Sequence, residues 1–294
     1  MKFLLYSVLC IFSAISMVSS LNNTTLEKGL LDFFFNNCKQ CKCGVPNRES
    51  RLIGGEYLRT YEFPWISMIQ IKSSVAPAVL INDKYVITAA NQVLGLSPLD
   101  IKVTLGAFDR CFPDQSSANV SVDQIIVNPD FSPGNRANDL ALIKLSTPVT
   151  FDKRVRPICL STPGYNYLGQ VATVVGWSEA QTVEGPIVAS CRPRKSGLPI
   201  LGHDECLGTA ADPQYFSADK GCVGVVGAPS VVCNVDAGGP VMYRSKSGVY
   251  DLIGILSDQN DCSPKPSTAL YTNINQHLRW ITQNTKDACY CYKT

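Results

Sequence analysis

Residues 79–88, VLINDKYVIT, contain two short β-rich runs on either side of a polar Asn-Asp-Lys connection. Runs of this kind around a short polar segment are typical of a β-hairpin. Further short apolar runs, separated by Gly, Pro, Asn and Asp, occupy residues 65–71, 101–105, 125–127, 140–145, 171–175 and 252–256. Many short strands with frequent turns predict an all-β sandwich or barrel. Only residues 273–283 have a helical pattern, with Leu278 and Ile281 three positions apart.

Size and charge narrow the classes of protein to which the chain can belong. Its 294 residues, 45% of them hydrophobic, suffice for one large all-β domain or two smaller ones. The net charge is only +2, from 26 basic and 24 acidic residues. So small an excess gives no reason to expect nucleic acid or a membrane surface as a partner. We expect a monomer that binds neither.

The first 20 residues are typical of a secretory signal peptide. Lys2 supplies the positive start, residues 3–15 are mostly apolar, and the small residues for cleavage lie at 18–20. The apolar run is too short to span a membrane. We therefore expect a secreted, extracellular protein. Possible glycosylation sites in that compartment are Asn22, Asn23 and Asn119.

Cysteine usage agrees with an extracellular location. Of the 13 cysteines, Cys10 lies in the signal peptide, which leaves an even number in the mature chain and indicates disulfides. The close spacing of Cys38, Cys41 and Cys43 raises zinc binding as an alternative. An oxidising compartment disfavours thiolate ligands, and no histidine is nearby. We expect neither a metal nor a cofactor.

Residues 21–51 differ in character from the rest of the chain. They combine a polar start, an apolar cluster at residues 30–35 and three cysteines. We interpret them as a cysteine-containing pro-segment that precedes a main domain at residues 52–294. A small docking helix in the apolar cluster is an alternative interpretation.

Four segments occur in a characteristic order: RLIGG at 51–55, VITAAN at 86–91, NDLALI at 138–143 and CNVDAGGP at 233–240. In order and spacing they resemble the activation site and the histidine, aspartate and serine segments of the trypsin/chymotrypsin family of serine proteases. The resemblance runs from Cys43 to about Ile281. Its lead-in, CGVP at 43–46, is closest in style to secreted arthropod proteases, including those of venom and saliva. It implies two six-stranded antiparallel β-barrels with a C-terminal helix.

The positions that the resemblance assigns to catalysis depart from the family pattern. Peptide hydrolysis of this kind needs a hydroxyl nucleophile, an imidazole base, an orienting carboxylate and N–H donors for the oxyanion. Ala237 stands at the serine position and Asn91 at the histidine position, while Asp139 keeps the carboxylate. Val235 replaces the glycine of the oxyanion site, and a β-branched residue disfavours the positive φ expected there.

These losses leave little capacity for hydrolysis. Removing a triad of this kind lowers turnover about a millionfold, and losing an oxyanion donor lowers it roughly 100- to 1000-fold more. We interpret His203 and His277, the two histidines, as surface or packing residues and not as replacement bases. The sequence thus predicts a pseudoenzyme that binds an unidentified protein partner, as a protease cofactor, a decoy or a venom or saliva component. An endopeptidase with a rearranged site is the alternative.

The substrate cleft that the resemblance implies is altered too. Val231 stands where trypsin-like members carry the pocket aspartate. The family's Ser-Trp-Gly strand is replaced by Ser257, Asp258 and Gln259, and Ala269 is a further pocket position. A small-ligand carrier or inhibitor that uses the former cleft is a third hypothesis, although Gln259 argues for a blocked mouth.

The resemblance also implies disulfides and a buried ion pair. The implied pairs are Cys43–Cys159, Cys206–Cys222 and Cys233–Cys262, with Cys111–Cys191 favoured. The pairing of Cys38, Cys41, Cys289 and Cys291 stays open; one possibility joins the first two to the last two. In the family, cleavage after Arg51 frees Leu52 to pair with Asp236. An inherited Asp236 beside an uncut Arg51 is the alternative.

Two further expectations concern polar side chains. A buried Asp139 needs hydrogen-bond donors, and the Asn91 amide is expected to supply one. Arg192, Arg194 and Lys195 are interpreted as a solvated loop, with an exosite for an acidic partner as the alternative.

Overall fold

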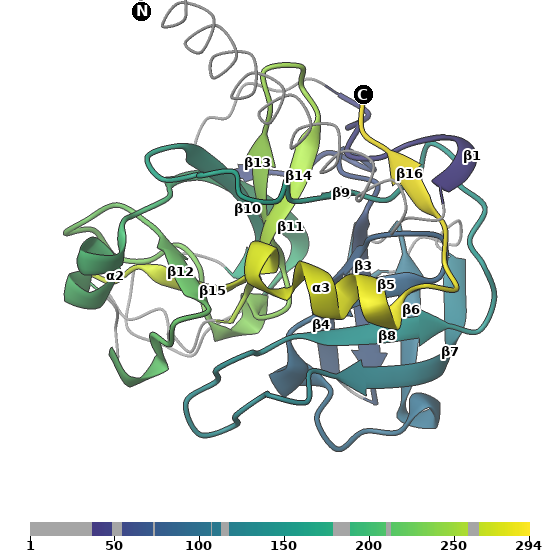
Figure 1. Ribbon diagram of the computed structural model, residues 1–294, viewed down its shortest axis with the longest axis horizontal. Coiled ribbons are helices and arrows are strands. Elements are labelled where there is room, and N and C mark those ends of the chain that lie inside the picture. The colour runs from purple at the N-terminus through teal and green to yellow at the C-terminus, as the bar shows by residue number, and fades with distance from the viewer. Residues whose placement is uncertain are drawn as a thin grey trace, which may run out of the picture.

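The structure is a computed structural model that describes residues 37–48, 55–72, 74–106, 108–112, 118–178, 189–209, 213–257 and 265–294 (Figure 1). Its strands are β1 (Asn37–Lys42), β2 (Glu56–Tyr57), β3 (Ile66–Ile71), β4 (Ser74–Leu80), β5 (Tyr85–Thr88), β6 (Ile101–Leu105), β7 (Ala118–Val127), β8 (Ala141–Leu145), β9 (Cys159–Leu160), β10 (Val171–Ser178), β11 (Ala189–Pro199), β12 (Lys220–Val223), β13 (Pro240–Arg244), β14 (Tyr250–Leu256), β15 (Ala269–Asn273) and β16 (Tyr290–Tyr292). The helices are α2 (His203–Thr209), α3 (Ile274–Asn284) and the short 3-10 helices η1 (Ala90–Gln92), η2 (Pro98–Asp100), η3 (Pro213–Tyr215) and η4 (Asn234–Asp236).

The first half of the chain forms a closed barrel. Six antiparallel strands follow the order β3-β4-β5-β8-β7-β6. The predicted hairpin at residues 79–88 joins β4 to β5, and the strand predicted at 85–88 matches β5. Every residue of β5 is buried, because its two faces contact the barrel interior and the second half of the molecule.

The second half of the chain forms the second barrel, in the order β12-β15-β14-β13-β10-β11. A bridge between Ile200 and Val223 brings the ends of β11 and β12 together. Two backbone hydrogen bonds support this closure, from Leu201 to Cys222 at 3.2 Å and from Gly224 to Pro199 at 3.1 Å. The prediction of an all-β double barrel is therefore confirmed, with β2 and β9 as additional strands.

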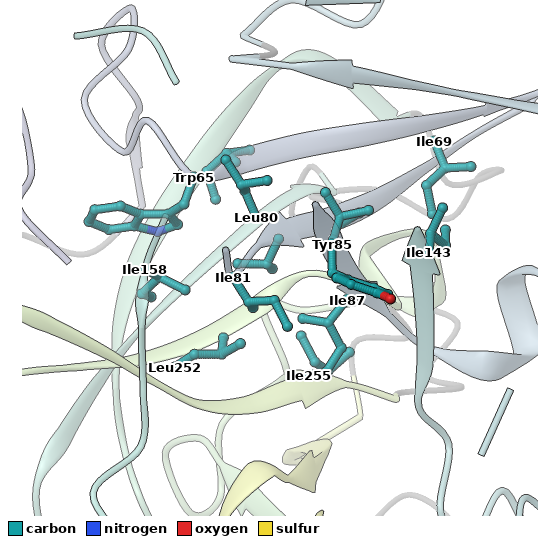
Figure 2. Packing of buried hydrophobic residues seen from close by; sticks show 14 of the residues in the cluster. Trp65, Ile69, Leu80, Ile81, Tyr85, Ile87, Ile143, Ile158, Leu252 and Ile255 are labelled. Carbon is teal, nitrogen blue, oxygen red and sulfur yellow. The ribbon is translucent and has the colours of Figure 1, made fainter. Parts of the chain in front are cut away.

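The core of the first barrel extends across the seam to residues of the second barrel, whose interior also holds a separate cluster. Figure 2 shows Ile81 and Ile87 of the first barrel beside Leu252 and Ile255 of β14 in the second. All four side chains are almost completely buried. Burial of apolar surface at this seam fixes how the barrels sit, and thereby where loops from both meet.

Helix α3 lies within one residue of its predicted range and covers the junction (Figure 1). Asn273 caps its start by accepting a hydrogen bond from the Asn275 amide at 2.9 Å. Ile274 and Ile281 are fully buried beneath it. Among the described residues, no helix has the length and apolar character that crossing a membrane requires.

Four disulfides join described side chains: Cys41–Cys291, Cys43–Cys159, Cys111–Cys191 and Cys206–Cys222. The last three confirm pairings from the sequence. Cys233 and Cys289 are also disulfide-bonded; Cys262, the predicted partner of Cys233, lies outside the described residues, as does the side chain of Cys38.

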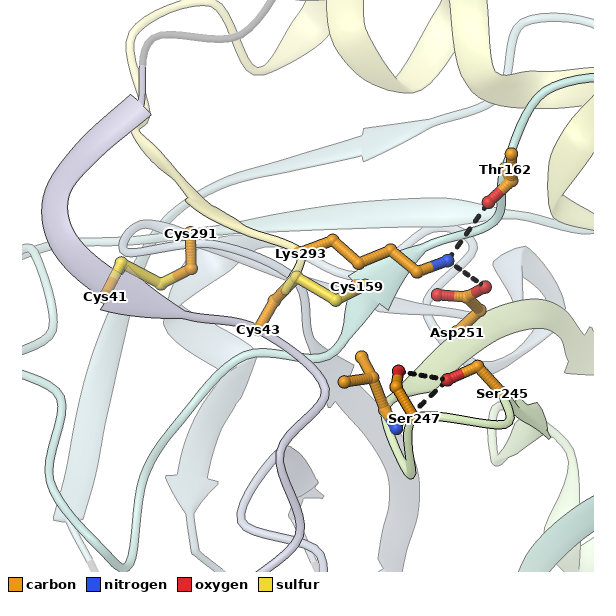
Figure 3. The surroundings of a disulfide bond; sticks show 10 residues. Cys41, Cys43, Cys159, Thr162, Ser245, Ser247, Asp251, Cys291 and Lys293 are labelled. Atoms are coloured by element: carbon orange, nitrogen blue, oxygen red, sulfur yellow. Dashed lines mark hydrogen bonds and ion pairs between the residues drawn. A yellow bond between two sulfur atoms is a disulfide. The ribbon is translucent and has the colours of Figure 1, made fainter.

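The residues just before Arg51 are attached to the C-terminal strand. Strand β1 pairs with β16 in parallel, and Cys41–Cys291 lies next to Cys43–Cys159 (Figure 3). Both bonds connect residues before Arg51 to residues far beyond it. A cut at Arg51 would therefore leave Cys41 and Cys43 covalently bound to the rest of the chain.

The interpretation of Arg192, Arg194 and Lys195 as a solvated loop is wrong, because all three lie in β11. Lys195 is buried and forms an ion pair with the buried Glu62. The Arg194 guanidinium donates to Gly55 O at 2.6 Å. The segment forms a strand despite its polar composition because β11 pairs with β10 and because Lys195 and Arg194 have these partners. Arg192 is exposed, with 63% of its side chain accessible, and Arg194 is half-buried; because Lys195 is buried, a three-residue basic exosite is excluded.

Candidate active site

The former catalytic segments meet at the seam between the barrels. Gly238, which follows η4, has a φ of +96°, and a Cβ there would lie 2.4 Å from Thr88 Oγ1 and 2.5 Å from Pro77 O. Only glycine permits so close an approach. The turn that carries Ala237 thus abuts the end of β5, and η1 with Asn91 begins two residues further on.

Asp139 lies at the centre of this seam with no exposed surface. Its Oδ1 accepts the Asn91 backbone N–H at 2.8 Å, and its Oδ2 accepts the Asn91 side-chain amide. Gln92 Nε2 donates to Asn91 Oδ1 at 2.9 Å, which fixes the orientation of that amide. The expectation that Asn91 donates to Asp139 is confirmed. Asn91 acts here as a donor, and its amide has no useful basicity near neutral pH.

On the other side of Asp139, the structure adds groups that the sequence did not reveal. Ser257, directly after β14, donates its hydroxyl to Asp139 Oδ2 at 2.6 Å. The ammonium of Lys220, in β12, donates to Ser257 Oγ at 2.9 Å and to Thr272 Oγ1 at 2.7 Å. Lys220 is 7% exposed. No sequence motif indicated Lys220, because its role depends on neighbours that only the pairing of β12 with β15 brings together.

The Ala237 position offers no nucleophile and no free oxyanion donor. The residue is 1% exposed, and its side chain is a methyl group. Its backbone N–H donates to Asn234 O at 3.2 Å, inside the turn of η4. Val235 lies within that 3-10 helix, a conformation with negative φ.

Asp236, directly before Ala237, is buried and accepts hydrogen bonds only from uncharged donors among the described residues. Its Oδ1 accepts the N–H groups of Trp177 at 2.6 Å and Ser178 at 3.0 Å. Its Oδ2 accepts the Ser178 hydroxyl and the Cys233 N–H, the latter at 3.0 Å. Burial raises the pKa of the Asp236 carboxyl above its usual range, although these hydrogen bonds oppose the shift.

A cavity of about 230 Å³ adjoins this carboxylate. Its lining includes Gly55, Gly176, Ser178, Arg194, Val231 and Asp236. Gly55 follows the predicted activation site and accepts a hydrogen bond from Arg194, so the first described residue after this site lines the same cavity as Asp236. Arg51 and Leu52 themselves lie outside the described residues.

The family model named Trypsin matches residues 52–281, which is most of the chain. The chain belongs to the trypsin family. Among its relatives, phenoloxidase-activating factor 3 of Holotrichia diomphalia is 29% identical over 272 residues, 83% of this chain and 75% of the relative. The CLIP domain-containing serine protease B10 of Anopheles gambiae is 28% identical over 295 residues, 90% and 76% of the two chains. Vitamin K-dependent protein C of Mus musculus is 26% identical over 245 residues, 79% and 51% respectively.

The trypsin-family pocket positions are only partly described. Val231 is 42% exposed at the cavity, Ala269 is fully buried in β15, and Ser257 is held against Asp139. Asp258 and Gln259 lie outside the described residues, so a blocked cleft stays a prediction.

Neither histidine takes the place of a catalytic base. His203 is exposed at the start of α2, where its ring packs on Phe216. His277 is buried in α3 and lies 3.6 Å from Asp219 Oδ2. Both placements agree with the surface and packing roles that the sequence indicated.

Of the possible glycosylation sites, only Asn119 can be placed. It is exposed on β7, while Asn22 and Asn23 lie outside the described residues. Its use stays a prediction.

Proposed function

We propose that this trypsin-family chain is a secreted, non-catalytic protein that acts by binding another protein. The observation that carries the proposal is the chemistry of the seam. Ala237 has only a methyl group, and the Asn91 side-chain amide donates its hydrogen bond to Asp139. Acyl transfer needs a group that attacks the carbonyl and a group that accepts its proton. Neither exists at these positions.

The oxyanion site supports the same conclusion. Stabilising a tetrahedral intermediate needs N–H groups that are free to point at the developing charge. The Ala237 N–H is engaged with Asn234 O, and Val235 lies in the turn of η4. A residual activity supplied by the oxyanion site alone therefore has no obvious source.

Secretion and protein binding rest on different observations. The disulfides belong to a protein of an oxidising compartment, and the first 20 residues have the pattern of a signal peptide. Both barrels keep packed hydrophobic cores although the catalytic groups are gone. A folded protein without catalytic groups acts through its surface, by binding another protein as a cofactor or a decoy.

The test has a catalytic arm and a binding arm. Purified protein, intact and cut at Arg51, is incubated with a broad peptide library beside an active trypsin. We expect turnover at least about a millionfold below the active enzyme. Activity that survives purification and disappears on one defined substitution would establish the rearranged endopeptidase instead.

In the binding arm, the folded protein is immobilised and exposed to the secretion of its source, with heat-unfolded protein as the control. We expect a protein that is retained only by the folded form and binds again as purified material. Retention of small molecules without any protein would favour the ligand carrier.

A further inference from the structure

A lysine ammonium is buried behind the former catalytic aspartate. Lys220 projects from β12 next to Thr272 of β15, its register partner. Its Nζ donates to the hydroxyls of Ser257 and Thr272 at 2.9 and 2.7 Å. Burying an ammonium is costly unless an anion and hydrogen-bond acceptors compensate it.

Both hydroxyls lead on to Asp139. Ser257 donates to Asp139 Oδ2 at 2.6 Å, and Thr272 donates to the Asp139 backbone carbonyl at 3.3 Å. A hydroxyl has one proton to donate and lone pairs with which to accept. Each therefore accepts from the ammonium and donates to Asp139, so the positive charge polarises both bonds in the same direction.

The carboxylate has a matching need. Asp139 is completely buried, and its other donor, Asn91, is neutral. In a working triad the imidazolium that forms beside this aspartate supplies positive charge. We propose that Lys220 is the counter-ion of Asp139 and balances the carboxylate charge through the hydroxyl of Ser257, while Thr272 links the ammonium to the Asp139 backbone carbonyl. The former triad is a closed, charge-balanced cluster that joins β12 and β15 of the second barrel to the first.

Asp219 is the competing anion, since it precedes Lys220 in sequence. Its Oδ2 accepts the Asn138 N–H at 2.9 Å and faces His277 Nε2 at 3.6 Å. Burial alone would raise the pKa of Asp219, but the adjoining His277 ring, hydrogen bonds from Ser217 and Asn138, and the charge of Lys220 lower it to about 2. Asp219 thus has its own partners, whereas both hydroxyl bridges from Lys220 end on Asp139.

The assignment of Lys220 to Asp139 does not depend on the proposed function, and it affects the chemistry that a histidine at position 91 could perform. An imidazole placed at position 91 would share its carboxylate with Lys220, and so would bind a proton more weakly than beside an uncompensated aspartate. Restoring the residues at 91 and 237 alone would therefore not rebuild an efficient proton relay.

A double-mutant cycle tests the assignment. Asp139→Asn and Lys220→Met each remove one charge of the proposed pair, and each should lower the melting temperature by at least about 5 °C. The double variant removes both charges and should melt above Lys220→Met alone. Losses that simply add would overturn the proposal.

The matched control is the same cycle with Asp219→Asn in place of Asp139→Asn. Its coupling with Lys220→Met should be the smaller of the two. A coupling equal to or larger than that of Asp139 would assign Lys220 to Asp219 and reject the proposal.

A second measurement leaves Lys220 in place, in case Lys220→Met does not fold. NMR of the lysine side chain follows the pH at which Lys220 loses its proton in the wild type, Asp139→Asn and Asp219→Asn. We expect this pH to fall by about one unit or more in Asp139→Asn, and by less in Asp219→Asn. An unchanged value in Asp139→Asn contradicts the proposal, because a purely structural lysine does not sense that carboxylate.

Discussion

Asp139 and Asp236 are both buried at the seam, yet their surroundings differ. Asp139 is enclosed by the Asn91 amide, the Ser257 hydroxyl and, behind it, the Lys220 ammonium. Asp236 accepts four uncharged donors and adjoins a cavity of about 230 Å³. The first carboxylate has its charge compensated within the fold. The second lies beside that cavity, and burial raises its pKa although the four hydrogen bonds oppose the shift.

The two carboxylates bear on different parts of the proposal. At the seam around Asp139, Ala237 offers no nucleophile, Asn91 offers no base, and the carboxylate is surrounded by donors. The surroundings of Asp236 hold the parts that a conformational switch needs, namely a carboxylate and a cavity that is also lined by Gly55. We infer that catalysis and activation have been separated in this chain, and the following predictions probe each carboxylate in turn.

The largest effect is expected from Asp236→Ala. This change removes the acceptor of three backbone N–H groups and one hydroxyl in a fully buried site. Leaving buried donors unsatisfied should lower the free energy of unfolding by about 3–5 kcal/mol. Urea unfolding measures it, with Asp130→Ala, at an exposed aspartate, as the control. A loss no larger than that of the control would mean that the carboxylate is dispensable.

Asp219→Asn should have a smaller, pH-dependent effect. The folded-state pKa is lowered from 3.8 to about 2, so the carboxylate stabilises the fold above pH 4 and loses that contribution as the pH falls toward 2. We expect the variant to lose on the order of 2 kcal/mol at pH 6 and much less at pH 2.5. Urea unfolding at both pH values measures the difference. A loss independent of pH would show that the charge plays no part.

Lys293→Met addresses a third buried carboxylate, at Asp251. Burial raises the pKa of Asp251, and the Lys293 ammonium, at 2.6 Å, opposes the shift (Figure 3). A raised pKa means that stability is fully present below pH 3.8 and is lost as the pH rises through the folded-state value. The variant raises that value further.

Lys293→Met should therefore cost more at pH 7 than at pH 4. We expect about 1 kcal/mol at pH 7, a modest figure because Lys293 is 37% exposed. Urea unfolding of Lys293→Met and of Lys286→Met, at an exposed lysine, provides the comparison. Equal losses at the two pH values would remove Asp251 from the explanation.

The smallest expected shift follows cleavage after Arg51. If the new amino terminus at Leu52 reaches Asp236, the melting temperature should rise by roughly 2–4 °C. Limited trypsin digestion followed by a thermal melt measures the shift. Arg51→Gln, which resists the cut, is the control. A clean cut without any shift would favour an inherited Asp236 with no switch.

Much of the fold follows from the sequence, and the exceptions have physical reasons. The ranges of β5 and β6 are predictable because apolar residues dominate them and turns bound them. Strand β11 is not, since ASCRPRKSGLP holds three basic residues and two prolines. It becomes a strand because β10 pairs with it and Glu62 compensates Lys195.

The residues of the candidate site also divide into those that the sequence predicts and those that it does not. The degenerate positions and the Asn91–Asp139 contact are predictable because four segments fix their register. Lys220 is not predictable, because a single lysine in the segment KGCV belongs to no recognisable motif. Its significance arises from a cross-strand neighbour at Thr272 and from Ser257, 37 residues later in the chain.

The central claim is that no group at the seam can form an acyl bond. The most direct test incubates the purified, Arg51-cut protein with an organophosphate probe and records the intact mass, with active trypsin treated in parallel. The mass should stay unchanged while the trypsin gains one probe per molecule. A stoichiometric covalent adduct on this chain would contradict the account.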